Sequence, residues 1–170
     1  MRITNKGEYG LRLAIRLARN YPAGEPMTTH EIAEAEHLPE EYVQKLLWEL
    51  LRAGVIESRR GAKGGFRLAK SPQKITAYQI VLALEGESFE VACRRFTEGE
   101  SKCIYSDPHA CGLRELWFKL YKTVNELLKE ANLGLLIREE NEVREHLRKI
   151  ANRGRSSSRS AAKNGHEVMA

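Results

Sequence analysis

Long apolar runs and targeting signals are absent from this sequence. It holds no run of about eighteen apolar residues, the length that a membrane-spanning helix needs, and it opens on no pattern typical of a signal peptide. Internal repeats are also absent. We therefore expect a cytoplasmic protein without membrane spans. Its 170 residues suffice for one domain with a modest core and an appendage.

The residue groupings of an enzyme active site are missing too. The sequence shows no nucleophile with a placed base, no glycine-rich loop for phosphate groups and no paired carboxylates in an apolar setting. A metal-dependent enzyme is therefore a weak interpretation, and we expect a protein that is not an enzyme. A zinc-stabilised interaction module stays open as an alternative.

Cysteine is scarce and unevenly placed. The three cysteines, Cys93, Cys103 and Cys111, all lie between residues 89 and 112, where hydrophobic periodicity is lost. An odd set fits a disulfide framework poorly and fits metal binding or idle thiols better. A loop of this length needs something to order it. Thiolates hold iron-sulfur clusters, and three thiolates with a histidine such as His109 can hold zinc, so both metal sites and inert thiols remain open.

Charge of one sign is only in slight excess. Lysine and arginine number 28 against 23 acidic residues, which gives a net charge of +5. The placement is more informative, because residues 59–70 hold several cations and no acidic residue. This pattern suggests a polyanionic partner. Residues 151–170 are rich in serine and basic residues without a core pattern, so we expect a disordered basic tail.

The stretch from Thr28 to Ala69 predicts a helix, a turn, a second helix and a basic hairpin. Thr28 or Thr29 can cap the first helix, Pro39 fits the first position of the second, and Gly54 ends it. The second helix has one apolar face at three-four spacing, formed by Val43, Leu46, Leu47, Leu50 and Leu51. We expect Trp48, although it falls outside this face, to be wedged between helices. Two apolar runs then bracket residues 59–65, which predicts a hairpin with a glycine-rich tip. The fold class expected is mainly α with a small β-hairpin wing, a winged helix-turn-helix.

Helices on both sides complete the predicted organisation. Thr4 caps a first helix over residues 5–20, and the capping box of Thr76 and Gln79 opens a helix over residues 77–84 that should pack against the first. Residues 113–131 then carry an apolar stripe wider than one small domain can cover: Leu113, Leu116, Trp117, Leu120, Tyr121, Val124, Leu127, Leu128 and Ala131. We expect this helix to form a homodimer, with Trp117 in its interface. A shorter amphipathic segment follows, up to residue 150.

Taken together, residues 1 to about 145 resemble the Rrf-two family of bacterial transcription regulators, which has IscR-like, NsrR-like and RirA-like members. The resemblance is carried by the segment Met1 to Tyr9, by Leu46 to Ser58, and by Arg60-Gly61 followed by Gly64-Gly65-Phe66. It implies a homodimer, usually a repressor, that binds palindromic operators in double-stranded DNA. We divide the chain into a winged helix-turn-helix DNA-binding domain (1–86), a cysteine-bearing sensor loop (87–112), the dimerisation and C-terminal helices (113–150) and the tail (151–170).

Pattern and resemblance agree on DNA as the partner. The polar face of the second helix can contact base edges or backbone in the major groove while the hairpin reaches the minor groove. The expected DNA-binding residues are Tyr42, Gln44 and Lys45 on the helix and Arg59, Arg60, Gly61 and Lys63 in the hairpin. Two alternatives are a winged helix that contacts another protein and a hairpin that is only a solvated edge.

The resemblance also implies a cofactor. In many members three loop cysteines hold an iron-sulfur cluster, [2Fe-2S] or [4Fe-4S], and Cys93, Cys103 and Cys111 match this set, although their gaps are wider than in better-known members. Arg114 stands where IscR-like proteins have a histidine ligand. Glu8 matches the position that supplies a carboxylate from the partner subunit in NsrR-like relatives, and we favour it over His109 as the fourth ligand.

A surface ion pair of Glu8 with Arg12 is the ordinary alternative to that ligand role. The cluster would sense redox state, nitric oxide or iron. A regulator that binds zinc, or one without a cluster that responds to a metabolite or a protein partner, is the competing interpretation.

Overall fold

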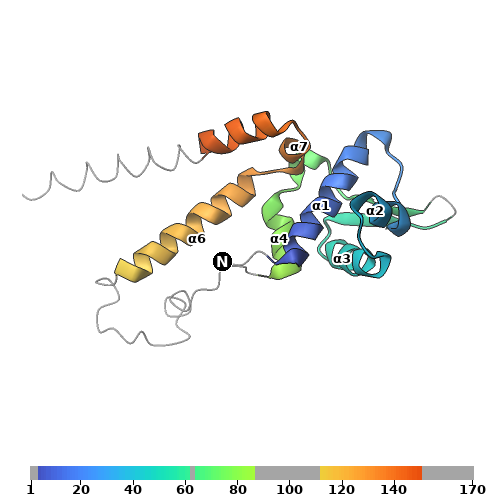
Figure 1. The fold of residues 1–170 in the computed structure, drawn as a ribbon, viewed down its shortest axis with the longest axis horizontal. Coiled ribbons are helices and arrows are strands. Elements are labelled where there is room, and N and C mark those ends of the chain that lie inside the picture. Colours follow the sequence, from blue (N-terminus) through green and yellow to red (C-terminus); the bar gives the residue numbers. More distant parts are fainter. Residues whose placement is uncertain (1–3, 62–63, 87–111, 151–170) are drawn as a thin grey trace, which may run out of the picture.

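The computed structural model describes residues 4–61, 64–86 and 112–150 (Figure 1). Its elements are, in order, α1 (Asn5–Asn20), the 3-10 turn η1 (Tyr21–Ala23), α2 (Thr29–Glu36), α3 (Glu40–Arg52), β1 (Ile56–Arg59), β2 (Gly65–Leu68), η2 (Pro72–Lys74), α4 (Ala77–Glu85), α6 (Gly112–Glu130) and α7 (Leu133–Leu136). Residues 140–150 are helical as well. The expected fold class, a winged helix-turn-helix with a long following helix, is confirmed.

Local capping sets the start of α2 and α3. Thr28 caps α2 with a full capping box, since its hydroxyl accepts from the Glu31 N–H while the Glu31 carboxylate accepts from the Thr28 N–H. His37 adopts a left-handed conformation with φ of 53°, which ends α2 and turns the chain toward α3. The sequence predicted Pro39 as the first residue of this helix. In the structure Pro39 is the N-cap, and α3 begins one residue later, at Glu40.

The hairpin is a two-stranded antiparallel sheet. Ile56 pairs with Leu68 and Arg59 with Gly65, which places Arg59 inside β1 rather than in the tip. Residue Met27, just before α2, forms an additional bridge with Phe66 through hydrogen bonds of 2.9 and 2.7 Å. This bridge attaches β2 to the residue before α2, so the hairpin is held at its base.

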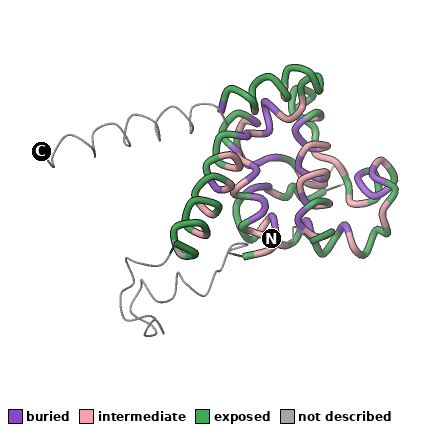
Figure 2. The backbone as a smooth tube through the Cα atoms, turned by 60° about the vertical axis from the view of Figure 1, so that its left-hand side comes forward, coloured by how far each residue is buried: buried purple, intermediate pink, exposed green. Residues whose placement is uncertain are grey.

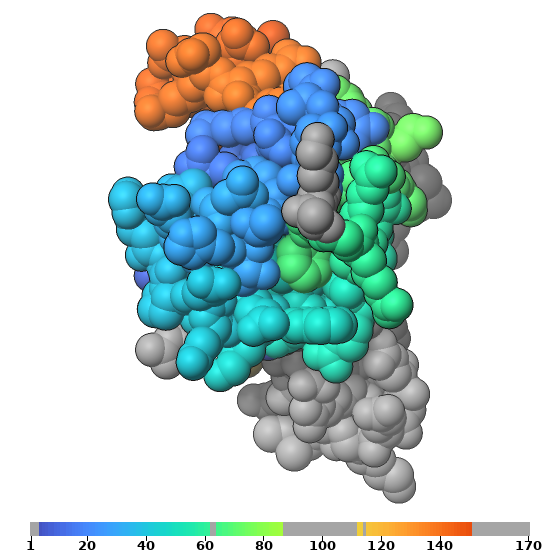
Figure 3. Space-filling model, turned by 90° about the vertical axis from the view of Figure 1, so that its right-hand side faces the viewer, coloured from blue at the N-terminus to red at the C-terminus, as the bar shows by residue number. Residues whose placement is uncertain are grey.

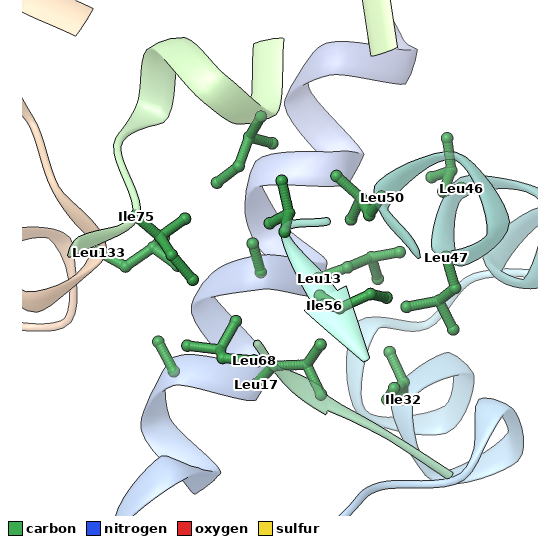
Figure 4. Packing of buried hydrophobic residues seen from close by; sticks show 14 of the residues in the cluster. Leu13, Leu17, Ile32, Leu46, Leu47, Leu50, Ile56, Leu68, Ile75 and Leu133 are labelled. Atoms are coloured by element: carbon green, nitrogen blue, oxygen red, sulfur yellow. The ribbon is translucent and has the colours of Figure 1, made fainter. Parts of the chain in front are cut away.

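One hydrophobic core joins α1, α2, α3, the hairpin, α4 and α7 (Figure 4). Its largest fully buried side chains include Leu13, Ile32, Leu47, Ile56 and Leu133. α4 packs against α1 as expected, and a Cβ added at Gly10 would lie 1.8 Å from Leu84 Cδ1, so the two helices approach closely there.

The chain leaves this core after α4 and returns to it after α6. The Ala77 N–H donates to the Ala131 carbonyl at 2.7 Å, and the Leu133 N–H donates to the Ile75 carbonyl at 2.8 Å. These bonds form a bridge between Thr76 and Asn132. α6 itself extends away from the core and is largely exposed (Figure 2). Among the described residues, no helix combines the length and apolar character needed to cross a membrane.

Candidate nucleic-acid interface

One face of α3 is open to solvent. The buried side chains Val43, Leu46, Leu47 and Leu50 fix the helix against the core, and the opposite stripe holds Glu41, Gln44, Lys45 and Trp48, all exposed. α2, α3 and the hairpin share the side of the molecule seen in Figure 3. One helix and one hairpin therefore lie on the same side of the molecule.

The three α3 residues expected to contact DNA differ in how far their side chains are exposed. Gln44 and Lys45 are exposed, and neither makes a side-chain hydrogen bond or ion pair within the described part of the chain. Tyr42 is half-buried, because its ring meets Tyr9 of α1 edge to face with centroids 5.9 Å apart. Of the expected α3 contacts, Gln44 and Lys45 are therefore the more accessible.

Trp48 corrects an expectation. It is 53% exposed rather than wedged between helices. The position lies outside the buried stripe of α3, and the helical phase decides where the side chain points.

Two of the acidic side chains near this face have partners. The Glu49 carboxylate lies 2.7 Å from Lys6 Nζ of α1, and Glu40 lies 3.3 Å from His30 Nδ1 of α2. Glu41 remains exposed on the stripe without a partner among the residues described. The pairing of Glu49 with Lys6 lowers the net negative charge near the end of α3.

The hairpin supplies cations beside α3. Arg59, Arg60 and Gly61 are exposed, and neither arginine forms an ion pair within the described ranges. Gly61 has φ of 114°, a conformation that favours glycine. Lys63 lies outside the described residues.

Arg67 behaves differently from those two arginines. Its Nε lies 2.6 Å from Glu57 Oε1 across the strands. Sequence reasoning missed this cross-strand ion pair, because it depends on the strand register that pairs Glu57 with Arg67.

A buried carboxylate fixes the helix-turn-helix to α1. Glu36, 9% exposed, accepts from Arg12 Nε at 3.0 Å and from Arg16 Nε at 2.9 Å. The same guanidinium groups also donate to the backbone carbonyls of Glu36 and Ala35 at the end of α2. The Arg12 guanidinium lies over the Tyr9 ring as well, 5.4 Å from its centroid. This cluster was not found from the sequence.

The proposed cluster ligands are only partly within the described residues. Cys93, Cys103, Cys111 and the alternative His109 lie outside them. Glu8 is exposed in the first turn of α1, and its carboxylate has no partner among the residues described. Arg12 is engaged by Glu36, so the alternative ion pair of Glu8 with Arg12 is not formed. Over the described ranges, no group of three or more potential metal ligands comes together.

The apolar stripe of α6 is exposed near its beginning. Leu113 is 53% and Leu116 60% exposed, and Phe118 and Leu120 are exposed as well. Trp117 is half-buried. Toward the end of α6 the stripe is less exposed, since Val124, Leu127 and Leu128 are half-buried, and Lys129 Nζ lies 4.8 Å from the centroid of the Tyr78 ring of α4.

Comparisons with known proteins agree on one family. The model of the Rrf2 family, described as an iron-dependent transcriptional regulator, matches residues 3–139. CymR of Bacillus subtilis, named an HTH-type transcriptional regulator, is 35% identical over 133 residues, 78% of this chain and 87% of that protein. NsrR of Bacillus licheniformis is 29% identical over 150 residues, 88% of this chain and 99% of that protein.

Solved structures give the same result. The structure titled as CymR, the global cysteine regulator of B. subtilis, has a TM-score of 0.67 at 33% identity and covers 81% of this chain and 96% of that one. IscR of T. potens has a TM-score of 0.61 at 27% identity and covers 79% and 84%. The relatives are named as regulators, which confirms the expectation of a protein that is not an enzyme.

Proposed function

Because the chain belongs to the Rrf2 family of transcriptional regulators, we propose that it is a homodimeric repressor that binds a palindromic DNA operator through α3 and the hairpin. The observation that carries this proposal is the accessible pair Gln44 and Lys45 on α3, beside a hairpin with two unpaired arginines, Arg59 and Arg60. Guanidinium and ammonium groups without an intramolecular partner are available to phosphate and base edges. Lys63 completes the proposed hairpin contacts, and Tyr42 supports α3 from its half-buried position.

The proposed homodimer rests on α6. Three exposed leucines at three-four spacing on one helix, Leu113, Leu116 and Leu120, are costly in water, and pairing with a second copy removes them from solvent. A dimer also matches the two half-sites of a palindrome. Sedimentation equilibrium should give twice the chain mass of 19.4 kDa, and Leu116→Glu should shift the protein to monomer and weaken operator binding. Leu116→Met is the matched control that keeps the apolar surface.

We also propose that an iron-sulfur cluster controls operator binding, held by Cys93, Cys103 and Cys111 with Glu8 from the partner subunit. The donor set fits such a cluster, since thiolates are its preferred ligands and the Glu8 carboxylate is free of other partners among the described residues. A bound cluster supplies a centre that reacts with oxidants and nitric oxide and depends on iron supply.

The first turn of α1 offers a route from such a site to DNA. Lys6 in this turn pairs with Glu49 of α3. The Thr4 hydroxyl and the Gly7 N–H donate to Glu85 at the end of α4, directly before the cysteine-bearing segment. A ligand bound at Glu8 therefore acts on a turn that touches both the proposed recognition helix and the start of the proposed sensor loop. Any preference of the ligand for one arrangement of this turn biases the position of α3.

The experiment has two arms. Protein isolated without oxygen is assayed for iron, sulfide, zinc and visible absorbance, and DNA binding is measured on duplexes selected from a random library. Iron and sulfide in similar amounts, with absorbance lost in Cys103→Ala and weakened in Glu8→Ala, support the cluster, whereas colourless protein with zinc supports the zinc-binding alternative. Glu34→Ala is the control for removing an exposed carboxylate. If Cys103→Ala keeps both DNA binding and its response to oxidants, the switch is absent.

The similarity to CymR keeps a second candidate in view, a regulator without a cluster that responds to a metabolite or to a protein partner. The CymR structure of B. subtilis is titled a global cysteine regulator. Metal-free protein that still binds its operator, with an affinity that changes on adding cysteine or a cell extract depleted of metal, would favour this candidate.

A further inference from the structure

Trp48 is the most exposed apolar side chain of α3. Half of its surface meets water, at 53%, while Val43, Leu46, Leu47 and Leu50 are buried and Leu51 is half-buried. An exposed indole on an otherwise well-packed helix costs free energy in the isolated protein. Such a cost is recovered when a partner covers the ring.

The position of Trp48 points to the same partner as Gln44 and Lys45. It follows Gln44 by four residues and Lys45 by three, so the three side chains form one stripe on α3. At the rise of an α-helix, Trp48 lies about 6 Å beyond Gln44 along the axis, which corresponds to roughly two base-pair steps. A helix that lays Gln44 and Lys45 in the major groove therefore carries Trp48 along the same groove.

The surroundings of the indole suit an apolar contact. Its neighbour Glu49 is already paired with Lys6 at 2.7 Å, so its negative charge is compensated on the protein itself. The indole is a flat apolar surface with one donor and no acceptor. On base edges in the major groove the apolar group is the C5-methyl of thymine.

We propose that Trp48 contacts thymine methyl groups in the major groove and so helps to select the operator sequence. This inference rests on the proposed function, because it requires α3 to be the helix that enters the groove. It adds a specificity-determining residue that sequence reasoning had assigned to the interior.

The test uses the full chain labelled with 5-fluorotryptophan and a duplex of about 25 base pairs selected from a random library, long enough for two half-sites. Fluorine NMR gives a signal for Trp48 and one for Trp117, and Trp48→Phe assigns them. On adding duplex, the Trp48 signal should shift while the Trp117 signal on α6 serves as the internal control. Trp48→Ala should weaken binding about tenfold, and Trp48→Phe should restore most of the loss.

Replacing each thymine by deoxyuridine removes only the methyl group. At the contacted positions this should raise the Kd of the wild-type protein about fourfold, the equivalent of one buried methyl group, and leave the Kd of Trp48→Ala unchanged. An equal rise in Kd for the wild type and Trp48→Ala would overturn the inference. A Trp48 signal that does not shift on adding duplex, or that shifts with protein concentration alone, would overturn it as well. A wild-type protein that selects no duplex would instead refute the proposed function itself.

Discussion

The guanidinium Nε of Arg12 lies 3.0 Å from the carboxylate of Glu36, and this contact ties the first helix to the turn of the helix-turn-helix. Arg16 completes it from the next turn of α1. Glu36 is nearly buried while both arginines reach solvent. If the ion pairs were broken, the Glu36 carboxylate would therefore be the group left without hydrogen-bond partners or water. The Glu36 side chain therefore adds a polar link between α1 and α2 to the hydrophobic packing that holds α2 and α3.

Glu36→Ala should therefore lower the free energy of unfolding by about 1 to 3 kcal/mol, the range for hydrogen bonds to charged groups when the partners remain partly solvated. Urea unfolding followed by circular dichroism measures it. Glu34→Ala on the exposed side of α2 should change stability by less than about 0.5 kcal/mol. Equal effects of the two substitutions would show that the cluster of Glu36, Arg12 and Arg16 does not stabilise the protein.

Gly65→Ala should loosen the base of the hairpin. Gly65 has φ of 152°, and an added Cβ would lie 2.4 Å from the Met27 carbonyl oxygen, so both backbone conformation and the bridge to Phe66 oppose the change. We expect a loss of about 2 kcal/mol or more. Gly24→Ala is the matched control, because Gly24 also has positive φ, at 71°, but no atom within 4 Å of its added Cβ. A Gly24→Ala loss as large as that of Gly65→Ala would show that the close contact is unimportant.

Arg60→Ala should weaken operator binding by about 1 to 3 kcal/mol and reduce the salt dependence by about one counterion. The reason is the exposed, unpaired guanidinium at the end of β1. Arg148→Ala removes the same charge from the helical segment 140–150, which lies far from the hairpin in Figure 1, and should leave the slope unchanged. Titrations at several salt concentrations measure both. Equal salt dependence of operator binding for the wild type and Arg60→Ala would show that the hairpin does not contact DNA.

The capping box of α2 should make stability depend on pH. The backbone N–H of Thr28 donates to Glu31 at 2.7 Å and holds the pKa of this carboxyl below its ordinary value of 4.5, and the Thr28 hydroxyl adds to the effect. A pKa lowered by folding contributes stability above the unfolded value, and this contribution is lost as the pH falls through the folded pKa. The effect is small because Glu31 is exposed.

Glu31→Ala should therefore destabilise the protein at pH 7, with a difference from wild type that shrinks once the pH falls below about 4.5. Thr28→Ala is the contrasting variant. It also removes the acceptor of the Glu31 N–H, so part of its cost should persist at low pH. Thermal unfolding at pH 7 and pH 3.5 measures both variants, and a Glu31→Ala difference independent of pH would contradict the ionic contribution.

Local signals in the sequence predicted most of the fold. The caps at Thr4 and Thr76 were found, and Thr28 was one of two candidates for the cap of α2, because a helix N-terminus is satisfied by side chains within three residues. The cluster of Glu36 with Arg12 and Arg16 was missed because its partners are 24 and 20 residues apart. Nothing in the local pattern links such positions.

For the candidate site, too, the local pattern predicted some features and missed others. The helical phase of α3 correctly placed Gln44 and Lys45 in solvent. It placed Trp48 there as well, and the exposed indole follows this helical phase rather than the expected position between helices. The DNA contacts and the cluster ligands remain predictions, since their partners are outside the chain or among the residues not described.

The bridge between Thr76 and Asn132 fastens the chain just after α6 to the residue before α4. The chain departs at the end of α4 and is fastened again beside the start of the same helix, with Leu133 buried in the common core. The packing that holds α3 comes from α1, α2, α4 and the hairpin, which all lie outside the segment between these two points. We therefore expect that a different sequence in this segment would leave α3 in place, so that one DNA-binding unit could be combined with different sensing segments.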